Sequence, residues 1–378
     1  MGHPERDLAG LVQVVGTNGK GTTALALAAA LQEMGHPSGA YLSPHVLSYT
    51  ERVVVGGSQV SEDEFAAAMG ETMEIADREG IPASQFELLT AGALRMFAAA
   101  GLLWAVLEAG LGARHDATSV VRPDHIVLTN VSIDHSEYLG ETVEEIAAEK
   151  LASLTPGAAL FLGTDDPRVV DLAHSTCRRI GARLVLPGAA GADISFPAMA
   201  SYAADDVRLG LAVAESLLAR RLPDEVMEKV ARDVAKALPG RFEVHEAGGV
   251  PVVVDGGHNA EGISAALTGI RRAYKDRPLG VVFGVLREKD VASMLAQLER
   301  EAHVIVLTRP ESERAADPAE VRLRYHPLDL GENTALVVED PLEALGVAVE
   351  ALRGAAGVVL VAGSLATVAP VLRWLREA

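Results

Sequence analysis

The sequence of 378 residues is poor in cysteine and in positive charge. Cys177 is its only cysteine, so an intrachain disulfide is excluded and a reducing compartment is the expected setting. Lys and Arg number 33 against 52 Asp and Glu, which gives a formal net charge of −19. Because nucleic-acid binding relies on clustered Lys and Arg, we expect no nucleic-acid partner, and any anionic ligand must meet local positive groups.

Long hydrophobic runs are also missing. The longest, residues 96–107, is bounded by Arg95 and Glu108 and is too short to cross a hydrocarbon core of about 30 Å. We expect the end of a helix there, followed by a buried strand. The opening residues, MGHPERDLAG, contain no apolar targeting segment, and Arg6 stands where a myristoylation signal has Ser or Thr. We therefore expect a cytoplasmic protein without a membrane partner.

Short apolar runs alternate with alanine- and leucine-rich stretches along the chain. The runs are apolar throughout, which is typical of strands covered on both faces in a parallel sheet with crossover helices. In the first part of the chain the expected strands are residues 11–15, 39–43, 103–108, 125–131, 158–162 and 182–186. A second series follows at 250–255, 280–285, 303–308, 335–339 and 357–364. The predicted fold class is α/β.

A chain of this length exceeds one ordinary core, so two domains are expected. The Pro-Gly pair at residues 239 and 240 is a turn signal between the two series of strands. We predict a boundary at this turn, with one α/β domain over residues 1–238 and a smaller α/β domain over residues 239–378.

The stretch LVQVVGTNGKGTT, residues 11–23, joins an expected strand to an expected helix through a glycine-rich loop. In such a loop the backbone N–H groups turn toward a phosphate, and the helix N-terminus adds partial positive charge. Lys20 would reach the outer phosphates, and the Thr22 hydroxyl would bind Mg²⁺. The usual phosphate-loop pattern has Ser or Thr where Gly21 stands, so a plain strand-to-helix turn is the alternative.

Polar residues close the neighbouring strands. The second expected strand ends at Ser43, with His45 just beyond it; the third ends at Glu108; the fourth is followed by Asp134 and His135. Ligands of open α/β sheets bind outside the carboxyl ends of the strands, so these groups should meet at one crevice. A buried carboxylate needs a cation or a donor, and Mg²⁺ beside Glu108 would supply one.

Each of these residues also has an ordinary interpretation. The histidines could be loop residues, Glu108 could cap a helix, and Asp116 could pair with Arg114. Lys150, in EEIAAEK, has the pattern of a solvated helix lysine, and residue chemistry alone does not select it. Their occurrence at consecutive strand ends is what favours a shared site.

Eight motifs, in order along almost the whole chain, resemble those of the dihydrofolate synthase and folylpolyglutamate synthase family of Mur-type ATP-dependent amide ligases. They are GTNGKGTT, YLSPHVLSYTERV, QFELLTAGAL, EAGLGARHDAT, SIDHSEYLGETVEEIAAEK, LPGRFEV, DGGHN and REKD. The resemblance implies a P-loop parallel-sheet ATPase domain over residues 1–238. It implies a smaller Rossmann-like α/β domain for the amino acid and nucleotide over residues 239–378.

The activity implied by this resemblance is the ATP-dependent joining of a folate or dihydropteroate carboxylate to the amine of L-glutamate. The carboxylate is phosphorylated to an acyl phosphate, the amine attacks, and phosphate leaves, so catalysis depends on charge neutralisation and positioning. The implied cofactors are ATP and Mg²⁺. The implied partners are small-molecule substrates in folate metabolism, and we expect a monomer.

Carried over residue by residue, the resemblance also implies a site. The residues matched to ATP binding are Gly16, Thr17, Asn18, Gly19, Lys20, Gly21 and Thr22, with Arg241 and Asp255 from the second domain. Those matched to the metal site are Thr22, Ser43, Glu108, His135 and Lys150. Lys150 matches a lysine that the family carbamylates, which turns a cation into an anionic metal ligand. The expected catalytic residues are Lys20, Lys150 and His258, and domain closure would exclude water.

Several positions depart from the family pattern. His115 and Ser119 stand where Leu and Asn are usual, near the region that the family uses for the ring system of the acceptor. Asp206 stands where an Asn on the adenine side is common, and a carboxylate cannot donate a hydrogen bond as an amide can. These departures leave open a ligase of the same chemistry that acts on a non-folate acid. A nucleotide-binding protein without ligase activity is the alternative from another class.

Overall fold

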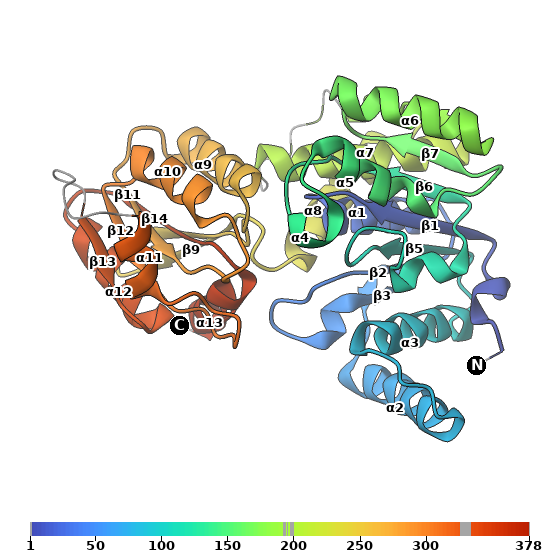
Figure 1. Ribbon diagram of the computed structural model, residues 1–378, viewed down its shortest axis with the longest axis horizontal. Helices are drawn as coiled ribbons and strands as arrows, with labels where there is room; N and C mark the ends of the chain where they lie inside the picture. The colour runs from blue at the N-terminus through green and yellow to red at the C-terminus, as the bar shows by residue number, and fades with distance from the viewer. Residues whose placement is uncertain (1, 192–193, 195, 197–199, 326–333, 378) are drawn as a thin grey trace. The chain divides into compact units, whose positions relative to one another are not determined.

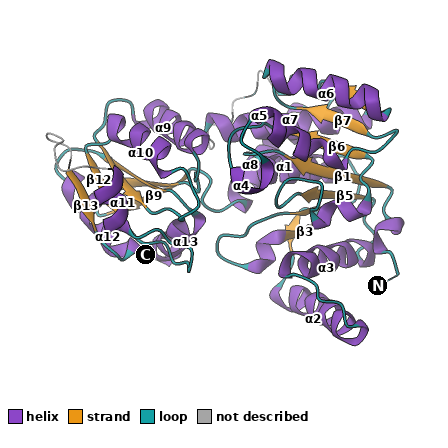
Figure 2. Cartoon of the chain, viewed as in Figure 1, coloured by secondary structure: helices purple, strands orange, loops and turns teal. Residues whose placement is uncertain are grey.

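The computed structural model describes residues 2–191, 194, 196, 200–325 and 334–377. The chain forms two compact units. Unit 1 comprises Met1–Ala198 with Ala203–Leu238, and unit 2 comprises Met199–Tyr202 with Pro239–Ala378. Each unit is a β-sheet covered by helices (Figure 1, Figure 2). Among the described residues, no helix is both long enough and apolar enough to cross a membrane.

In the described part of unit 1, eight strands form one sheet in the order β4-β3-β2-β5-β1-β6-β7-β8. The strands are β1 (Gly10–Val15), β2 (Ser38–Tyr41), β3 (Val53–Val55), β4 (Ser58–Gln59), β5 (Trp104–Glu108), β6 (His125–Leu128), β7 (Ala159–Leu162) and β8 (Arg183–Val185). The strands from β2 to β8 in this order pair in parallel, whereas β3 and β4 add antiparallel pairs at one edge. Val14 of β1 pairs with Glu108, and Val15 pairs with Leu128. The three central strands β5, β1 and β6 therefore end at the same level.

Helices cover both faces of this sheet. They are α1 (Lys20–Glu33), α2 (Glu62–Glu79), α3 (Gln85–Ala99), α4 (Ser136–Leu139), α5 (Val143–Lys150), α6 (Pro167–Ile180), α7 (Ser201–Leu218) and α8 (Asp224–Ala237). On one face, Leu11 and Val15 of β1 belong to the buried clusters beneath α3, α5 and α6. Residues of a strand point alternately to the two faces, so Val12 and Val14 face the other side. There α1, rich in the strong helix formers Ala and Leu, packs on β1, β2 and β5, with α7 and α8 against it.

In the described part of unit 2, six strands form a sheet in the order β13-β12-β11-β14-β10-β9. They are β9 (Glu243–Ala247), β10 (Val250–Val254), β11 (Leu279–Phe283), β12 (Val304–Leu307), β13 (Thr334–Val337) and β14 (Val358–Ala362). Only the β9–β10 pair is antiparallel among these described strands. The helices of unit 2 are α9 (Ala260–Tyr274), α10 (Val291–Glu301), α11 (Pro318–Tyr325), α12 (Pro341–Leu352) and α13 (Leu365–Glu377).

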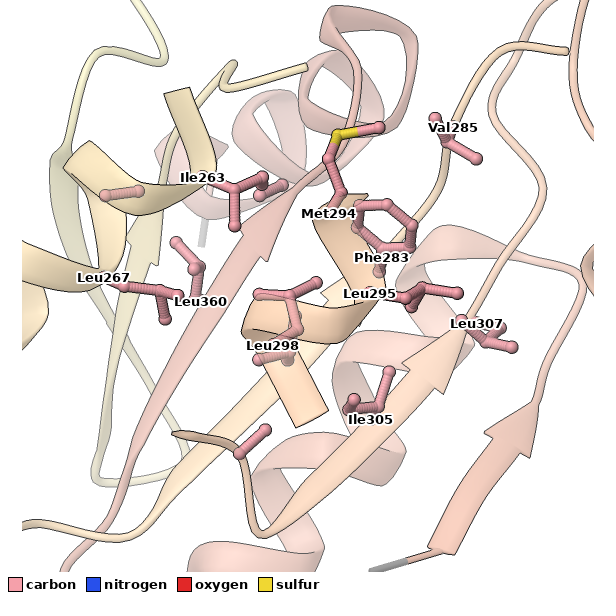
Figure 3. Packing of buried hydrophobic residues seen from close by; sticks show 14 of the residues in the cluster. Ile263, Leu267, Phe283, Val285, Met294, Leu295, Leu298, Ile305, Leu307 and Leu360 are labelled. Atoms are coloured by element: carbon pink, nitrogen blue, oxygen red, sulfur yellow. The ribbon is translucent and has the colours of Figure 1, made fainter. Parts of the chain in front are cut away.

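The core beneath α9 and α10 is built from apolar side chains (Figure 3). Leu279, Val281 and Phe283 alternate along β11 and so point to one face of the sheet. Met294 and Leu298, one turn apart on α10, lie on the stripe that faces them. Burial of these two side chains against β11 therefore stabilises the packing of α10 on the sheet.

The α/β fold class is confirmed, and the expected strands correspond to β1, β2, β5 to β8 and β10 to β14. The expectation for residues 96–107 also holds, since α3 ends at Ala99 and β5 begins at Trp104. The prediction missed the antiparallel edge strands β3, β4 and β9. β3 and β4 are very short, and β9 alternates between exposed and more buried positions, so none of them has a long apolar run.

Two leucines on neighbouring helices test the unit 2 core. Leu298 of α10 is 0% exposed and Leu323 of α11 is 73% exposed. Leu298→Ala should lower the free energy of unfolding by about 3 kcal/mol, because it removes buried methyl groups and leaves a cavity. Leu323→Ala should change it by less than about 0.5 kcal/mol. Urea denaturation of both variants measures the difference, and equal losses would contradict the burial of Leu298 in the unit 2 core.

Candidate functional site

The loop between β1 and α1 is a tight turn that only glycine suits at two positions. Gly16 and Gly19 have φ of 153° and 76°, in the range that residues with a Cβ avoid. A Cβ on Gly16 would lie only 1.9 Å from Thr129 Oγ1. Helix α1 begins at Lys20, directly after this turn, so the first N–H groups of the helix lie at the loop. This is the geometry of an anion site.

Residues that follow β6 hold the loop from one side. The Asn18 N–H donates to the Asn130 side chain at 2.9 Å, and the Asn130 amide donates back to Asn18 O at 3.2 Å. Thr129 Oγ1 also donates to Asn18 O, at 2.7 Å. The Ser132 N–H donates to Thr17 Oγ1 at 3.0 Å. The sequence prediction placed residues 129–131 inside the strand 125–131, whereas β6 ends at Leu128, and so it missed the role of this segment.

Two lysines lie at this loop. Lys20 Nζ donates to Thr17 O at 3.1 Å, and Lys150 Nζ, from the last residue of α5, donates to Gly16 O at 2.7 Å. Lys150 is only 3% exposed, so the interpretation as a solvated helix lysine is wrong. Burial, together with the positive charge of Lys20, lowers the pKa of Lys150 to about 7, although Asp134 acts in the opposite direction. Near neutral pH, much of Lys150 is therefore an uncharged amine.

Glu108 ends β5 with a carboxylate that is buried, at 5% exposure. It lies on the same face of the sheet as Val106, the face covered by α1. A Cβ on Gly21 would lie 3.0 Å from Glu108 Oε2, and the Ser43 N–H donates to that oxygen at 2.8 Å. Glycine at position 21 thus leaves room for the carboxylate beside the first turn of α1, which contains Thr22.

His135 lies in the segment after β6 and directly precedes the first residue of α4. Its backbone is left-handed, with φ of 51°, and its N–H donates to Asp134 Oδ1 at 2.9 Å. The ring Nε2 lies 3.9 Å from Asp134 Oδ2. Asp134 also acts electrostatically on Lys150, so it links the two expected metal-site residues. The sequence analysis placed Asp134 among the polar groups expected at this crevice but did not include it in the metal set.

Oxygen donors dominate the expected metal set. Among the described residues, no group of three or more His, Cys, Asp and Glu is arranged to hold a metal ion. The expected set does not need such a group, because it combines Glu108 and His135 with the hydroxyl residues Thr22 and Ser43 and with Lys150. A buried carboxylate next to the first turn of α1 fits a hard divalent cation.

Asp116 has a structural role in the loop after β5. Its carboxylate accepts the N–H groups of Gly110 and Leu111 at 2.9 and 3.0 Å. Arg114 instead pairs with Glu149 at 3.0 Å. The alternative that Asp116 pairs with Arg114 is therefore wrong.

Ser119 and His45 are also engaged with neighbouring residues. The buried Gln13 amide donates to Ser119 Oγ at 2.8 Å, and Ser119 Oγ donates to Ala113 O at 2.6 Å. Arg52 Nε donates to His45 Nδ1 at 2.9 Å, and burial followed by the charge of Arg52 lowers the pKa of His45. Ser119, one of the departures from the family pattern, therefore supports its own loop.

In unit 2, Asp255 lies at the carboxyl end of β10 and is 3% exposed. It accepts the Phe242 N–H at 3.0 Å, the Gly257 N–H at 2.8 Å and the Tyr202 hydroxyl. Burial raises the pKa of Asp255, whereas the Tyr202 hydroxyl and then the charge of Arg241 act against this rise. The carboxylate organises the turn that joins β10 to α9.

Arg241 and His258 lie at the same turn. A Cβ on Gly256 would lie 2.7 Å from Arg241 Nη1. His258 Nδ1 lies 3.0 Å from Gly256 O. The three residues expected from unit 2, Arg241, Asp255 and His258, therefore come together at one strand end, as the loop residues of unit 1 do at another.

Both units match known families. Residues 14–182 match the Mur ligase middle domain, and residues 240–365 match the Mur ligase, glutamate ligase domain. The chain is 35% identical over 300 residues to the dihydrofolate synthase/folylpolyglutamate synthase of Escherichia coli, which covers 76% of this chain and 69% of that protein. The chain belongs to the dihydrofolate synthase/folylpolyglutamate synthase family.

Other members of the dihydrofolate synthase/folylpolyglutamate synthase family match the chain over its length. The Bacillus subtilis protein is 28% identical over 408 aligned residues, covering 100% of this chain and 92% of that protein. A solved structure of a bifunctional folylpolyglutamate synthase/dihydrofolate synthase with Mn, AMPPNP and L-glutamate bound has a TM-score of 0.83 and 28% identity. It covers 99% of this chain and 91% of that one. The resemblance inferred from the motifs is confirmed.

The buried amine of Lys150 should make stability depend on pH. In the folded chain its pKa is about 7 against an ordinary value of 10.5, so the unfolded state binds more protons between these values. The free energy of unfolding should therefore rise with pH across this window. Relative to Lys150→Met, the wild-type chain should gain about 3 kcal/mol from pH 7 to pH 10.

Urea denaturation in buffer free of metal and CO₂ measures this gain. Lys236→Met, at an exposed lysine of α8, is the matched control and should keep the wild-type slope. Parallel curves for the wild type and Lys150→Met would contradict the lowered pKa.

Proposed function

We propose that the chain is an ATP- and Mg²⁺-dependent ligase that joins L-glutamate to a carboxylate of a folate or dihydropteroate. The observation that carries this proposal is the pair of lysines at the glycine-rich loop, one of them buried, beside the buried Glu108 carboxylate. Family membership supports it, as does the relative that holds Mn, AMPPNP and L-glutamate.

The phosphate loop binds ATP in this proposal. Its residues are Gly16, Thr17, Asn18, Gly19, Lys20, Gly21 and Thr22. The N–H groups at the start of α1 and the charge of Lys20 attract the phosphates. Because residues 129–132 already hold the loop in shape, binding requires little reorganisation, and the donors face the negative charge that develops during phosphoryl transfer.

Thr22, Ser43, Glu108, His135 and Lys150 would hold Mg²⁺. When bound, the cation would neutralise negative charge on the transferred phosphoryl group. The buried Glu108 carboxylate and its neighbouring hydroxyl residues are the donor types that Mg²⁺ prefers. The Ser43 N–H that donates to Glu108 Oε2 at 2.8 Å orients the carboxylate for this role.

The reaction has two steps. A carboxylate oxygen of the acceptor attacks the γ-phosphorus of ATP, the bond to the bridging oxygen breaks, and ADP leaves. The amine of L-glutamate then attacks the acyl carbon, loses a proton and forms the amide, while the C–O bond to phosphate breaks. Lys20 neutralises charge on the phosphates. In unit 2, Arg241 and Asp255 are proposed to contact the nucleotide and His258 to contact the phosphate side.

Lys150 is proposed to be carbamylated. Its neutral amine, favoured by the lowered pKa, can add to CO₂ and release a proton, which leaves an anionic carbamate. A carbamate can bind a divalent cation, whereas an ammonium group cannot. The bond from Lys150 Nζ to Gly16 O would hold the nitrogen at the loop, since a carbamate keeps one N–H.

Lys150→Ala should therefore lose most ligase activity, about 100-fold or more, as expected when a metal-site group is removed. Acetate or another short carboxylate should restore part of it by replacing the missing anionic ligand. The rate of phosphate release with and without acetate measures this. Lys236→Ala, the control, should release phosphate at the wild-type rate with or without acetate. Full activity of Lys150→Ala without any additive would remove Lys150 from the mechanism.

We also propose a cytoplasmic monomer that uses only small-molecule substrates. The single buried cysteine supports the compartment, and the net charge of −19 supports the restriction to small-molecule substrates. A reducing compartment keeps such a thiol free, and the acidic surface disfavours phosphate-backbone partners.

The proposed function is tested by phosphate release with ATP, Mg²⁺ and L-glutamate, using dihydropteroate, tetrahydrofolate or no acceptor, with products identified by mass spectrometry. We expect glutamate-dependent phosphate release and a glutamate-sized mass gain on an acceptor. Lys20→Ala should abolish turnover while circular dichroism remains that of the wild type. ATP binding without turnover on either acceptor would favour a ligase for another acid, and ATP binding without turnover on any carboxylate would favour a non-catalytic nucleotide-binding protein.

A further inference from the structure

Helix α7 brings a carboxylate onto the phosphate loop. A Cβ on Gly19 would lie 2.0 Å from Asp206 Oδ1 and 2.6 Å from Asp206 Oδ2. The carboxylate therefore packs directly against the last residue before α1. Gly19 is also left-handed, with φ of 76°, so a larger residue here would strain the backbone and displace Asp206.

The packing of α7 on α1 holds Asp206 in this position. Thr23 Oγ1 donates to Asp206 O at 3.1 Å. One turn further along α7, a Cβ on Gly210 would lie 2.7 Å from Thr23 O and 2.8 Å from Ala26 Cβ. The two helices thus approach each other closely, and the Asp206 side chain is placed by their backbones.

The charge of Asp206 has the same sign as a phosphate. The N-terminus of α1 and Lys20 make the loop attractive to anions, and Asp206 places a carboxylate at that end of the helix. Like charges a few ångströms apart repel, although salt reduces the effect. A nucleotide that binds at the loop must therefore do so in the presence of this carboxylate.

We propose that Asp206 weakens the binding of nucleotide phosphates at the loop and thereby sets the affinity of the chain for ATP. This inference rests on the proposed function, because it concerns the same phosphate loop. The same repulsion favours the release of ADP after the reaction. Asp206 is thus an affinity-setting residue, and it takes no part in bond formation.

Asp206→Asn removes the charge and preserves the size of the side chain. We expect the Kd of ATP, and that of inorganic triphosphate, to fall about tenfold in calorimetric titrations, as expected from removing one nearby like charge. The Kd of adenosine, which has no phosphate, should not change. The KM for ATP should fall in the same proportion without a rise in kcat.

Asp205→Asn is the matched control. Asp205 is the preceding residue of α7, is exposed, and pairs with Arg208 at 2.9 Å. Its variant should keep wild-type values for ATP, triphosphate and adenosine. Circular dichroism and thermal unfolding should show that both variants are folded, since the hydrogen bond from Thr23 Oγ1 to the Asp206 carbonyl does not depend on the side chain of Asp205 or of Asp206.

Unchanged or weaker ATP binding by folded Asp206→Asn would overturn the inference. A change in adenosine binding in either direction would also overturn it, and would assign Asp206 to the base or the ribose. Lys20→Ala distinguishes a failure of the phosphate-loop assignment from a failure of the inference about Asp206. If Lys20→Ala binds ATP more weakly than the wild type and Asp206→Asn does not bind it more tightly, only the inference about Asp206 fails. If the wild type does not bind ATP or triphosphate, the phosphate loop and the inference both fail.

Discussion

Parallel pairing of β1 with both β5 and β6 is the constraint on which the site of unit 1 depends. The pairs Val14–Glu108 and Val15–Leu128 make the three strands end at one level. The residues that follow each end therefore meet: the glycine-rich loop after β1, the Glu108 carboxylate, and the segment 129–132. A shift of one residue in either register would move these groups by about 3.3 Å and turn each strand's side chains to the opposite face.

The loop is organised by contacts from both sides. Residues 129–132 hydrogen-bond its backbone and side chains, and α7 presses Asp206 against Gly19. Such a loop presents its N–H groups in a fixed arrangement, which is how a protein stabilises charge without reorganising during a reaction. Glycine is needed at positions 16 and 19 because Thr129 and Asp206 lie against these residues and because their φ values are positive. The glycines of the motif are therefore required by tertiary contacts as well as by the conformation of the loop.

Charge in this acidic protein is controlled locally. The net charge of −19 would repel a nucleotide, but Lys20 and Lys150 lie at the loop, and burial makes the second lysine easy to deprotonate. The buried Glu108 and the adjacent Asp206 carboxylate bring negative charge to the same place. Affinity for an anion at this loop is therefore a balance among a few side chains, and single substitutions can change it.

The sequence by itself determined the α/β class, most of the inner strands, the glycine-rich loop and the family, because strand periodicity, turn residues and ordered motifs are local properties of the chain. It also pointed to Glu108, Ser43 and His135, since these follow apolar strands. Only the tertiary structure decided that Lys150 is buried against Gly16, 134 residues away, that Asp206 lies on Gly19, and that Asp116 supports its own loop instead of pairing with Arg114. The existence and pairing of the antiparallel strands β3, β4 and β9 also came only from the structure, because these strands are too short or too polar to predict. Burial and contacts between distant residues arise from the packing of whole helices on a sheet, and no local pattern encodes them.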